Sequence, residues 1–183
     1  SELNINATQR LLEATRAHPI ERFVYASSSS VYGRAPGWPT METDPVAPHS
    51  PYGVTKLAGE LLCRAYAANF GLPTVALRYF TVYGPRQRPD MATRRLIDAA
   101  FDGTDIPMYG DGSQIRDFTF VGDVVDANLA AATQPVESGA FMAGDGRRGE
   151  APRGRRLPAG ARRRSSPSSR CATCHRRGAP PPR

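Results

Sequence analysis

The sequence predicts an α/β fold with a parallel sheet, and three features predict it. Short apolar runs rich in β-branched and aromatic residues, at 22–27 and 74–80, are typical of strands buried on both faces. A long helical pattern at 52–70 separates these two runs. Strands that alternate with helices of this length are joined by crossover connections, which place them parallel in one sheet.

The first half of the chain predicts two helices and two strands. The helical spacing of apolar residues stops at His18-Pro19, because the proline ring cannot continue a helix. The long helix ends at Gly71, since glycine favours the left-handed C-cap conformation. The predicted elements are a helix from Leu3 to Ala17, a strand at 22–27, a Pro- and Gly-bearing loop at 33–51, a helix at 52–70 and a strand at 74–80.

The second half continues the alternation with shorter elements. An Asp-Gly pair at Asp111-Gly112 between two short apolar runs is typical of a tight turn. The predicted elements are a loop at 82–90, a helix at 92–101, a strand at 106–109, a strand at 115–120, a helix at 123–132 and a strand at 140–143.

Residues 147–183 differ from the rest of the chain. Residues 1–146 hold 12 basic and 16 acidic side chains, whereas 147–183 hold 12 arginines and one acid. The net charge of +7 is therefore a property of the tail, and nucleic acid is the less favoured interpretation of it. We expect the tail to be disordered because it contains almost no large apolar residue. Its Arg/Pro/Ser composition is what a GC-rich coding sequence read in a shifted frame gives.

Other classes of protein are disfavoured by what the sequence lacks. Three cysteines are too few for a disulfide scaffold, and we predict no metal site. The CxxCH pattern at 171–175 matches haem attachment, but no apolar haem pocket or export signal accompanies it. No apolar run approaches the length of about 20 residues that spans a bilayer. With no secretory signal visible, the expected location is the cytoplasm.

A tyrosine and a lysine stand four residues apart at the start of the long predicted helix. This spacing places Tyr52 and Lys56 on one helical face, one turn apart. A neighbouring positive charge favours the phenolate, and lowering the pKa of a tyrosine by about three units is worth roughly 4 kcal/mol. Such a tyrosine takes a proton from a hydroxyl near neutral pH. The spacing also fits an exposed helical pair, but Lys56 is the only lysine among 24 basic residues, which favours a tunable charge.

A row of serines, Ser27 to Ser30, directly follows the first predicted strand. In open parallel sheets ligands bind outside the carboxyl ends of the strands, so these hydroxyls emerge where a substrate lies. A solvated turn explains the row equally well when it is taken alone. A Tyr-Lys pair some 20 residues later, at a helix start, favours the substrate site.

Five segments of the chain resemble the extended short-chain dehydrogenase/reductases, above all the nucleotide-sugar epimerases. In chain order they are NINATQRLLEA, YASSSSVYG, SPYGVTKLAGE, RYFTVYGPRQRPDMA and YGDGSQIRDFTFVGDVVDA. The resemblance covers Leu3 to Gly146. It implies a partial Rossmann-type parallel sheet with a small C-terminal substrate-binding part. The expected organisation is a partial NAD-dependent epimerase/dehydratase domain at 1–146 and the tail at 147–183.

The resemblance also implies roles for single residues. Tyr52 matches the catalytic base, Lys56 the residue that binds the nicotinamide ribose and tunes that base, and Ser28 the hydroxyl that bonds the reacting sugar oxygen. Arg116 matches an arginine that clamps the diphosphate, a task suited to a guanidinium. The implied cofactor-binding residues are Asn4, Tyr52, Lys56 and Tyr79. The implied substrate-binding residues are Ser28, Ser29, Ser30, Thr81, Arg88 and Arg116.

The reaction implied by the resemblance is transient oxidation at sugar carbon 4 of a UDP-sugar. Tyr52 removes the hydroxyl proton, a hydride goes to tightly bound NAD, and the hydride returns to the other face of the turned keto sugar. Dehydratase relatives carry an Asp-Glu pair where this chain has Ser29 and Ser30, which cannot do acid/base work at neutral pH. That difference favours epimerisation. Another reductase or dehydratase of this superfamily, and a non-catalytic remnant that binds a nucleotide sugar, remain alternatives.

The identity of the sugar stays open at this point. The segment with Thr81, Arg86 and Arg88 resembles the uronic acid 4-epimerases, whose substrate carries a carboxylate that an arginine could pair with. Contacts with phosphate or solvent explain loop arginines equally well. UDP-glucuronate and UDP-glucose are both expected substrates, and the resemblance implies a homodimer for full-length relatives.

The glycine-rich phosphate turn that this family carries after its first strand is missing from the expected place. The chain starts about where the helix before the fourth family strand begins. We therefore expect that roughly 60 to 90 residues of βαβ units are missing before it. Without them the sheet has an exposed edge, and the chain is expected to be an incomplete or inactive fragment.

Overall fold

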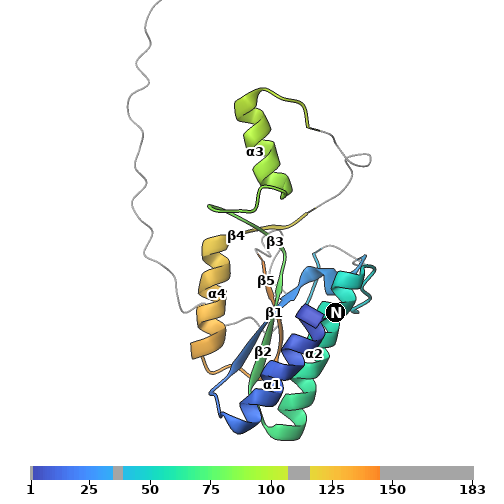
Figure 1. Cartoon of the computed structure of the whole chain (residues 1–183), viewed down its shortest axis with the longest axis vertical. Helices are drawn as coiled ribbons and strands as arrows, with labels where there is room; N and C mark the ends of the chain where they lie inside the picture. Colours follow the sequence, from blue (N-terminus) through green and yellow to red (C-terminus); the bar gives the residue numbers. More distant parts are fainter. Residues whose placement is uncertain (1, 35–38, 107–115, 145–183) are drawn as a thin grey trace, which may run out of the picture.

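The computed structural model describes residues 2–34, 39–106 and 116–144. Within these ranges, three parallel strands form the main sheet in the order β1-β2-β5, and two more form a separate parallel pair (Figure 1). The predicted α/β class and parallel sheet are confirmed. The strands are β1 (Phe23–Ser28), β2 (Thr74–Tyr79), β3 (Thr81–Tyr83), β4 (Phe118–Phe120) and β5 (Gly139–Ala143).

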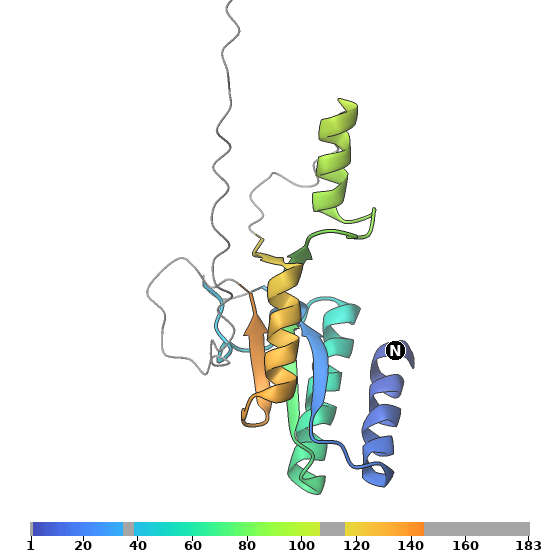
Figure 2. The same ribbon diagram turned by 90° about the vertical axis from the view of Figure 1, so that its left-hand side faces the viewer.

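Helices cover both faces of the main sheet. Helices α1 and α2 lie side by side on one face and α4 lies on the other, while α3 stands away from the sheet beyond β3 (Figures 1 and 2). None of the helices in the described ranges is both long and apolar enough to span a membrane. Their bounds are α1 (Ala7–Ala17), α2 (Pro51–Phe70), α3 (Ala92–Asp102) and α4 (Val121–Thr133); a π-helical turn (Glu2–Asn6) precedes α1 and a 3-10 turn (Ser29–Tyr32) follows β1.

Helix α2 begins within one residue of its predicted start and ends where predicted. The Ser50 hydroxyl accepts a hydrogen bond from the Gly53 N–H at 3.0 Å, and Pro51 occupies the first helical position. Gly71 takes the left-handed conformation, with φ 68°, and its N–H bonds to the Ala67 carbonyl. The helix therefore starts one residue before the predicted Tyr52 and stops where predicted.

Alternate side chains of β2 enter two separate cores. Val75 and Leu77 are fully buried against α4, whereas Ala76 packs toward α1 and α2 with Leu12 and Cys63. Burying each large aliphatic side chain contributes roughly 1.5–3 kcal/mol. The central strand is thus fixed from both faces, which makes the carboxyl ends of β1 and β2 a rigid platform.

Arg22 ties the end of α4 to the beginning of β1. Its guanidinium donates to the carbonyl of Ala131 at 2.9 Å and also to the carbonyl of Gln134. The last carbonyls of a helix lack partners within the helix, so a cation at this place satisfies them and complements the helix dipole. Helix α4 is held against the sheet by this contact.

Several boundaries differ from the predicted ones. The loop predicted at 82–90 was wrong for its first two residues, because 81–83 pair with 118–120 as β3 and β4. The predicted loop missed this strand because it is only three residues long. Strand β1 begins one residue later than predicted and includes Ser28. The predicted turn at 111–112, the disordered tail at 147–183 and, apart from Ile106, the strand at 106–109 lie outside the described residues.

Candidate active site

The serine row and the start of α2 meet at the carboxyl end of β1. Ser28 is the last residue of β1, and its hydroxyl accepts from the Ser30 N–H at 3.2 Å and contacts the Ser30 hydroxyl at 3.2 Å. A Cβ atom on Gly53 would lie 2.5 Å from the Ser30 carbonyl oxygen. The first turn of α2 therefore rests directly on the turn that carries the serines, and Tyr52 stands next to this contact.

The structure brings Tyr52 and Lys56 together. The Lys56 amine lies 5.7 Å from the ring centre of Tyr52 and 5.5 Å from that of Tyr25, and donates to the Ala26 carbonyl at 2.9 Å. Burial lowers the pKa of Lys56. An ammonium has three donors, of which Ala26 takes one. The Tyr52 side chain is half exposed, so its phenol is accessible to a ligand.

Asn4 lies against the first turn of the same helix. Its side-chain amide donates to the Thr55 hydroxyl at 3.1 Å, and that hydroxyl donates to the Tyr52 carbonyl at 2.8 Å. These contacts place the predicted cofactor-binding Asn4 within one helical turn of Tyr52 and Lys56. Three of the predicted residues thus gather at one end of α2.

Tyr79 occupies a different surface of the sheet. It pairs with Ser28 in the register of β1 and β2, but its hydroxyl donates to the Asn128 side chain on α4 at 2.8 Å. Burial raises the pKa of Tyr79. Its phenol therefore lies on the α4 side of the sheet, away from the face that carries α2, and its cofactor role stays a prediction.

Thr81, Arg88 and Arg116 belong to the second sheet and its loop. The Thr81 N–H donates to the Asp117 carbonyl at 3.1 Å, so Thr81 and Arg116 stand at adjoining ends of β3 and β4. The Arg88 side chain is 74% exposed and forms an ion pair with Asp90 at 3.0 Å. Their roles toward a substrate stay predictions.

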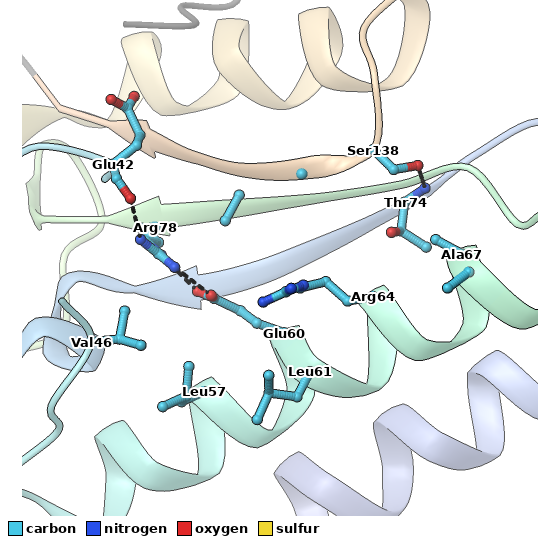
Figure 3. A pocket seen from close by; sticks show the side chains of 13 residues that line it. Glu42, Val46, Leu57, Glu60, Leu61, Arg64, Ala67, Thr74, Arg78 and Ser138 are labelled. Carbon is cyan, nitrogen blue, oxygen red and sulfur yellow. Dashed lines mark hydrogen bonds and ion pairs between the residues drawn. The ribbon is translucent and has the colours of Figure 1, made fainter. Parts of the chain in front are cut away.

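A buried charged network next to the site was missed by the sequence reasoning. Arg78 forms a bidentate ion pair with Glu60, at 3.0 Å from Nε to Oε1 and 2.7 Å from the terminal nitrogen to Oε2 (Figure 3). The Ser27 hydroxyl donates to Glu60 at 2.5 Å, and Arg78 donates to the Tyr32 hydroxyl at 2.8 Å. Ser27, Tyr32, Glu60 and Arg78 are all at most 6% exposed.

The burial and hydrogen bonds of the network explain the pKa shifts of Arg78 and Tyr32. Burial alone lowers the pKa of Arg78, but its hydrogen bonds to Glu60 and Tyr32 outweigh burial and raise it. Burial raises the pKa of Tyr32. The signal in the sequence was an arginine inside the apolar strand at 74–80 and a glutamate four residues after Lys56. A charge in an otherwise apolar strand is seldom buried without a partner.

A cleft of about 560 Å³ opens beside this network, between α2, β2 and β5. Glu60 and Arg78 point toward one another at its inner wall, and Glu42 and Arg64 reach its edge (Figure 3). Tyr52, Lys56 and Ser28 do not line it. The predicted catalytic residues therefore form an open surface at the strand ends, distinct from this cleft.

Comparison of the sequence with known protein families identifies the family of this chain. The model of the NAD dependent epimerase/dehydratase family matches residues 1–144. The chain belongs to the NAD-dependent epimerase/dehydratase family. The resemblance to this family that the sequence shows is confirmed, whereas the roles of Tyr52, Lys56 and the serine row stay predictions.

Three similar proteins carry informative names. An uncharacterized UDP-glucose epimerase, YtcB of Bacillus subtilis, is 54% identical over 72% of this chain and 42% of its own length. UDP-glucuronic acid 4-epimerase from Bacillus cereus, solved with UDP-glucuronic acid and NAD, is 46% identical with a TM-score of 0.72, covering 77% of this chain and 45% of its own. MoeE5, solved with UDP-glucose and NAD, is 52% identical with a TM-score of 0.71, over 77% and 48%. The chain spans less than half the length of each.

Proposed function

We propose that the chain is the catalytic and sugar-binding part of a UDP-sugar 4-epimerase that works with tightly bound NAD. The observation that carries the proposal is the gathering of Tyr52, Lys56 and the Ser28 turn at the carboxyl end of β1. The names of the similar proteins support the substrate class, a hexose or uronic acid attached to UDP. Cytoplasmic location and a homodimeric assembly stay predictions.

The residues at this site fit a nicotinamide cofactor. Lys56 presents an ammonium at the strand ends, fixed by the Ala26 carbonyl, with donors suited to the hydroxyls of a ribose. Asn4 and Thr55 add amide and hydroxyl groups beside it. NAD, when bound, accepts a hydride from sugar carbon 4 and returns it. The protein residues move the proton and fix the sugar.

Tyr52 is the proton acceptor in this proposal. Its side chain is half exposed and its ring centre lies 5.7 Å from the Lys56 amine, so the phenol is accessible to the hydroxyl at sugar carbon 4, which loses its proton to Tyr52. The Ser28 hydroxyl, held by Ser30, donates to the same sugar oxygen. When the hydride returns to the opposite face, Tyr52 gives the proton back. No net oxidation results, as an epimerase requires.

Serines at positions 29 and 30 support epimerisation over dehydration. Dehydration needs an acid that protonates the leaving hydroxyl and a base that takes a second proton. Ser29 and Ser30 open the turn after β1, and neither side chain exchanges protons at neutral pH. Tyr52 as the acid/base group suffices to reverse a configuration, and neither Ser29 nor Ser30 supplies the second group that expelling water requires.

The test is turnover in a chimera, because the chain spans under half of its relatives' length. Residues 1–144 replace the matched segment of the Bacillus subtilis relative, and conversion of UDP-glucose and UDP-glucuronate to their C4 epimers is followed by NMR. Tyr52→Phe is expected to lower kcat by roughly 100- to 10,000-fold, the usual contribution of a general acid/base. Tyr66→Phe, which removes a phenol bonded to Glu13, is the matched control.

Two outcomes would contradict the proposal. If the unmodified chimera epimerises neither sugar while its NAD is bound and its fold is intact, this segment does not carry the activity. If Tyr52→Phe turns over as fast as the unmodified chimera, Tyr52 is not the proton acceptor. Release of a dehydrated sugar in place of the epimer would assign the chain to the dehydratases of the same family.

A further inference from the structure

The buried network joins the segments that carry the predicted site. It reaches β1 through Ser27, α2 through Glu60 and β2 through Arg78. Arg78 also donates to Tyr32, the last residue of the turn that holds Ser29 and Ser30, and to the Glu42 carbonyl at 3.3 Å. Ser27 directly precedes Ser28 in the chain. The network therefore bonds to residues on both sides of Ser28 in the chain, and its side chains are almost fully buried.

On α2, Glu60 fixes the helical turn that follows Tyr52 and Lys56, the predicted catalytic pair. Tyr52, Lys56 and Glu60 succeed one another at four-residue spacing, so their side chains rise from neighbouring places on one side of α2. Lys56 reaches the Ala26 carbonyl and Glu60 reaches the Ser27 hydroxyl, on consecutive residues of β1. Two adjacent turns of α2 are thus fixed to two adjacent residues of the strand end.

The contact between α2 and β1 leaves little room for another register. A Cβ atom on Gly59 would lie 2.1 Å from the Tyr25 hydroxyl, so the helix backbone runs directly over the ring of Tyr25. The same ring lies 5.5 Å from the Lys56 amine. A small shift of α2 along β1 would therefore change the surroundings of this amine.

Stability alone is a weak reason to keep such a network. Replacing a buried ion pair with apolar residues of similar volume is often neutral or stabilising, because the charges lose their hydration on burial. Glu60 and Arg78 are 3% and 6% exposed and each uses several hydrogen bonds. What the network provides, and an apolar cluster cannot, is directional bonding between three elements.

We propose that Ser27, Glu60 and Arg78 are positioning residues that fix the register of α2 on the carboxyl end of β1. They thereby hold the Lys56 amine at the Ala26 carbonyl and beside the ring of Tyr52. This positioning role is inferred from contacts within the 183-residue chain and does not depend on the proposed function. Its consequence for turnover rests on the proposed function.

The first test uses Lys56 as a reporter in the 183-residue chain. Because it is the only lysine, a chain labelled with ¹³C-lysine and produced without a lysine-containing tag gives a single ε-methylene signal. Its midpoint in a pH titration measures how well water reaches the amine. Ser27→Ala and the double variant Ser27→Ala with Tyr32→Phe remove hydroxyls of the network, and Ser27→Ala changes no charge at any pH. Tyr32→Phe also removes a phenol that titrates at alkaline pH. Loss of that negative charge would lower the Lys56 midpoint, so an upward shift cannot come from it.

We expect both variants to move the Lys56 midpoint upward, toward the value of free lysine, because a loosened helix lets water reach the amine. The expected shift is about 0.5 pH unit, larger in the double variant. If both variants fold and the midpoint stays at its original value while only the denaturation temperature falls, the network merely stabilises the protein and the inference is overturned. Glu13→Gln, which removes an exposed carboxylate that Tyr66 of α2 bonds, is expected to leave the midpoint unchanged.

The second test separates this inference from the proposed function. In the chimera, Glu60→Gln keeps the shape of the side chain but weakens its bond to Arg78. We expect kcat to fall by roughly 10- to 100-fold with little change in KM, as a small misplacement of catalytic groups does. Unchanged kcat in Glu60→Gln, with turnover lost in Tyr52→Phe, overturns the positioning role alone. Full turnover in Tyr52→Phe overturns the proposed function. In that case the Lys56 titration still tests whether the network positions α2 on β1.

Discussion

The α-carbon of Gly53 faces the backbone carbonyl of Ser30 at the start of α2. A Cβ atom at this place would lie 2.5 Å from the Ser30 oxygen and 2.9 Å from the Pro48 side chain. Ser30 belongs to the 3-10 turn after β1, and the ring of Pro48 restricts its own backbone, so neither neighbour moves freely. The glycine therefore lets the first turn of α2 approach the serine turn, and this approach places Tyr52 beside the serines.

Gly53→Ala is expected to destabilise the chain although it sits in a helix. Helix propensity alone would make alanine more stable than glycine by about 1 kcal/mol. The clash with Ser30 opposes this gain, and inserting a methyl group into a packed contact costs roughly 1–3 kcal/mol. We expect a lower midpoint in urea denaturation, and in the chimera a loss of turnover beyond the loss of stability.

Gly139→Ala is the matched control for this substitution. The nearest atom to a Cβ at Gly139 belongs to Phe141 at 3.6 Å, which is an ordinary van der Waals contact. The urea midpoint is expected to stay close to that of the unmodified chain. A Gly53→Ala variant that is more stable than the unmodified chain would show that the helix does not rest on the serine turn.

The sequence predicted those features of the site that depend on residues close together in the chain, and it missed features that depend on long-range pairing. The spacing of Tyr52 and Lys56, the Gly71 cap and the parallel strands follow from helical periodicity, left-handed caps and apolar runs. Strand β3 has only three residues, and it pairs with residues of β4 that lie 37 positions later in the chain, so no local pattern marked it. Thr81 was expected next to a loop for that reason and stands at the beginning of this strand.

The buried network was missed for the same reason, because its members meet only through long-range packing. Glu60 and Arg78 are 18 residues apart, and only the packing of α2 on β2 brings their charges together. The sequence shows a charge in an apolar strand but does not show which residue neutralises it. For Tyr79, the sequence placed the residue at the strand end correctly, yet the alternation of side chains along β2 turns its phenol toward Asn128 on α4.

Arg88→Met is expected to reduce the preference for a uronic acid over a hexose. Arg88 is 74% exposed and its partner in this structure is Asp90, so it is available to a carboxylate at little cost. A hydrogen bond to a charged group is worth about 1.5–3 kcal/mol, which corresponds to roughly 10- to 150-fold in affinity. In the chimera, KM for UDP-glucuronate should rise by such a factor while KM for UDP-glucose stays nearly constant.

Arg94→Met provides the comparison for Arg88→Met. Arg94 is also an exposed arginine, paired with Asp98 within α3, and it lies outside the predicted substrate loop. We expect no change in either KM. If Arg88→Met weakens both substrates by the same factor, Arg88 contacts a phosphate of UDP instead of the sugar. If neither KM changes, Arg88 takes no part in binding.

The stability of the chain is expected to fall at alkaline pH. Burial, followed by the neighbouring Glu60, raises the pKa of Cys63 to about 12; burial, followed by Cys63, raises the pKa of Tyr25 to about 12. Their ordinary pKa values are about 8.5 and about 10. Between the ordinary and the raised value the unfolded chain binds fewer protons than the folded chain. The free energy of unfolding therefore falls as pH rises through this window.

Lys56 changes the pH dependence of stability in the opposite direction, but its effect is smaller than the combined effect of the buried acids. Its pKa is lowered by burial, so the unfolded chain binds more protons near pH 10 and stability rises with pH for this one group. Burial raises the pKa of Tyr32 and Tyr79 as well as that of Cys63 and Tyr25. Each group contributes at most about 1.4 kcal/mol per pH unit, so several raised acids exceed one lowered amine.

The measurement is the urea midpoint between pH 8 and 11, with one variant for each part of the window. Cys63→Ala removes the thiol, so the decline is expected to begin nearer pH 10, whereas Tyr25→Phe should flatten the decline above pH 10. Leu61→Ala removes a half-exposed side chain with no titrating group and should leave the slope unchanged. A midpoint that stays constant from pH 8 to 11 would show that water reaches the thiol and the phenol, and that α2 does not seal this side of β1.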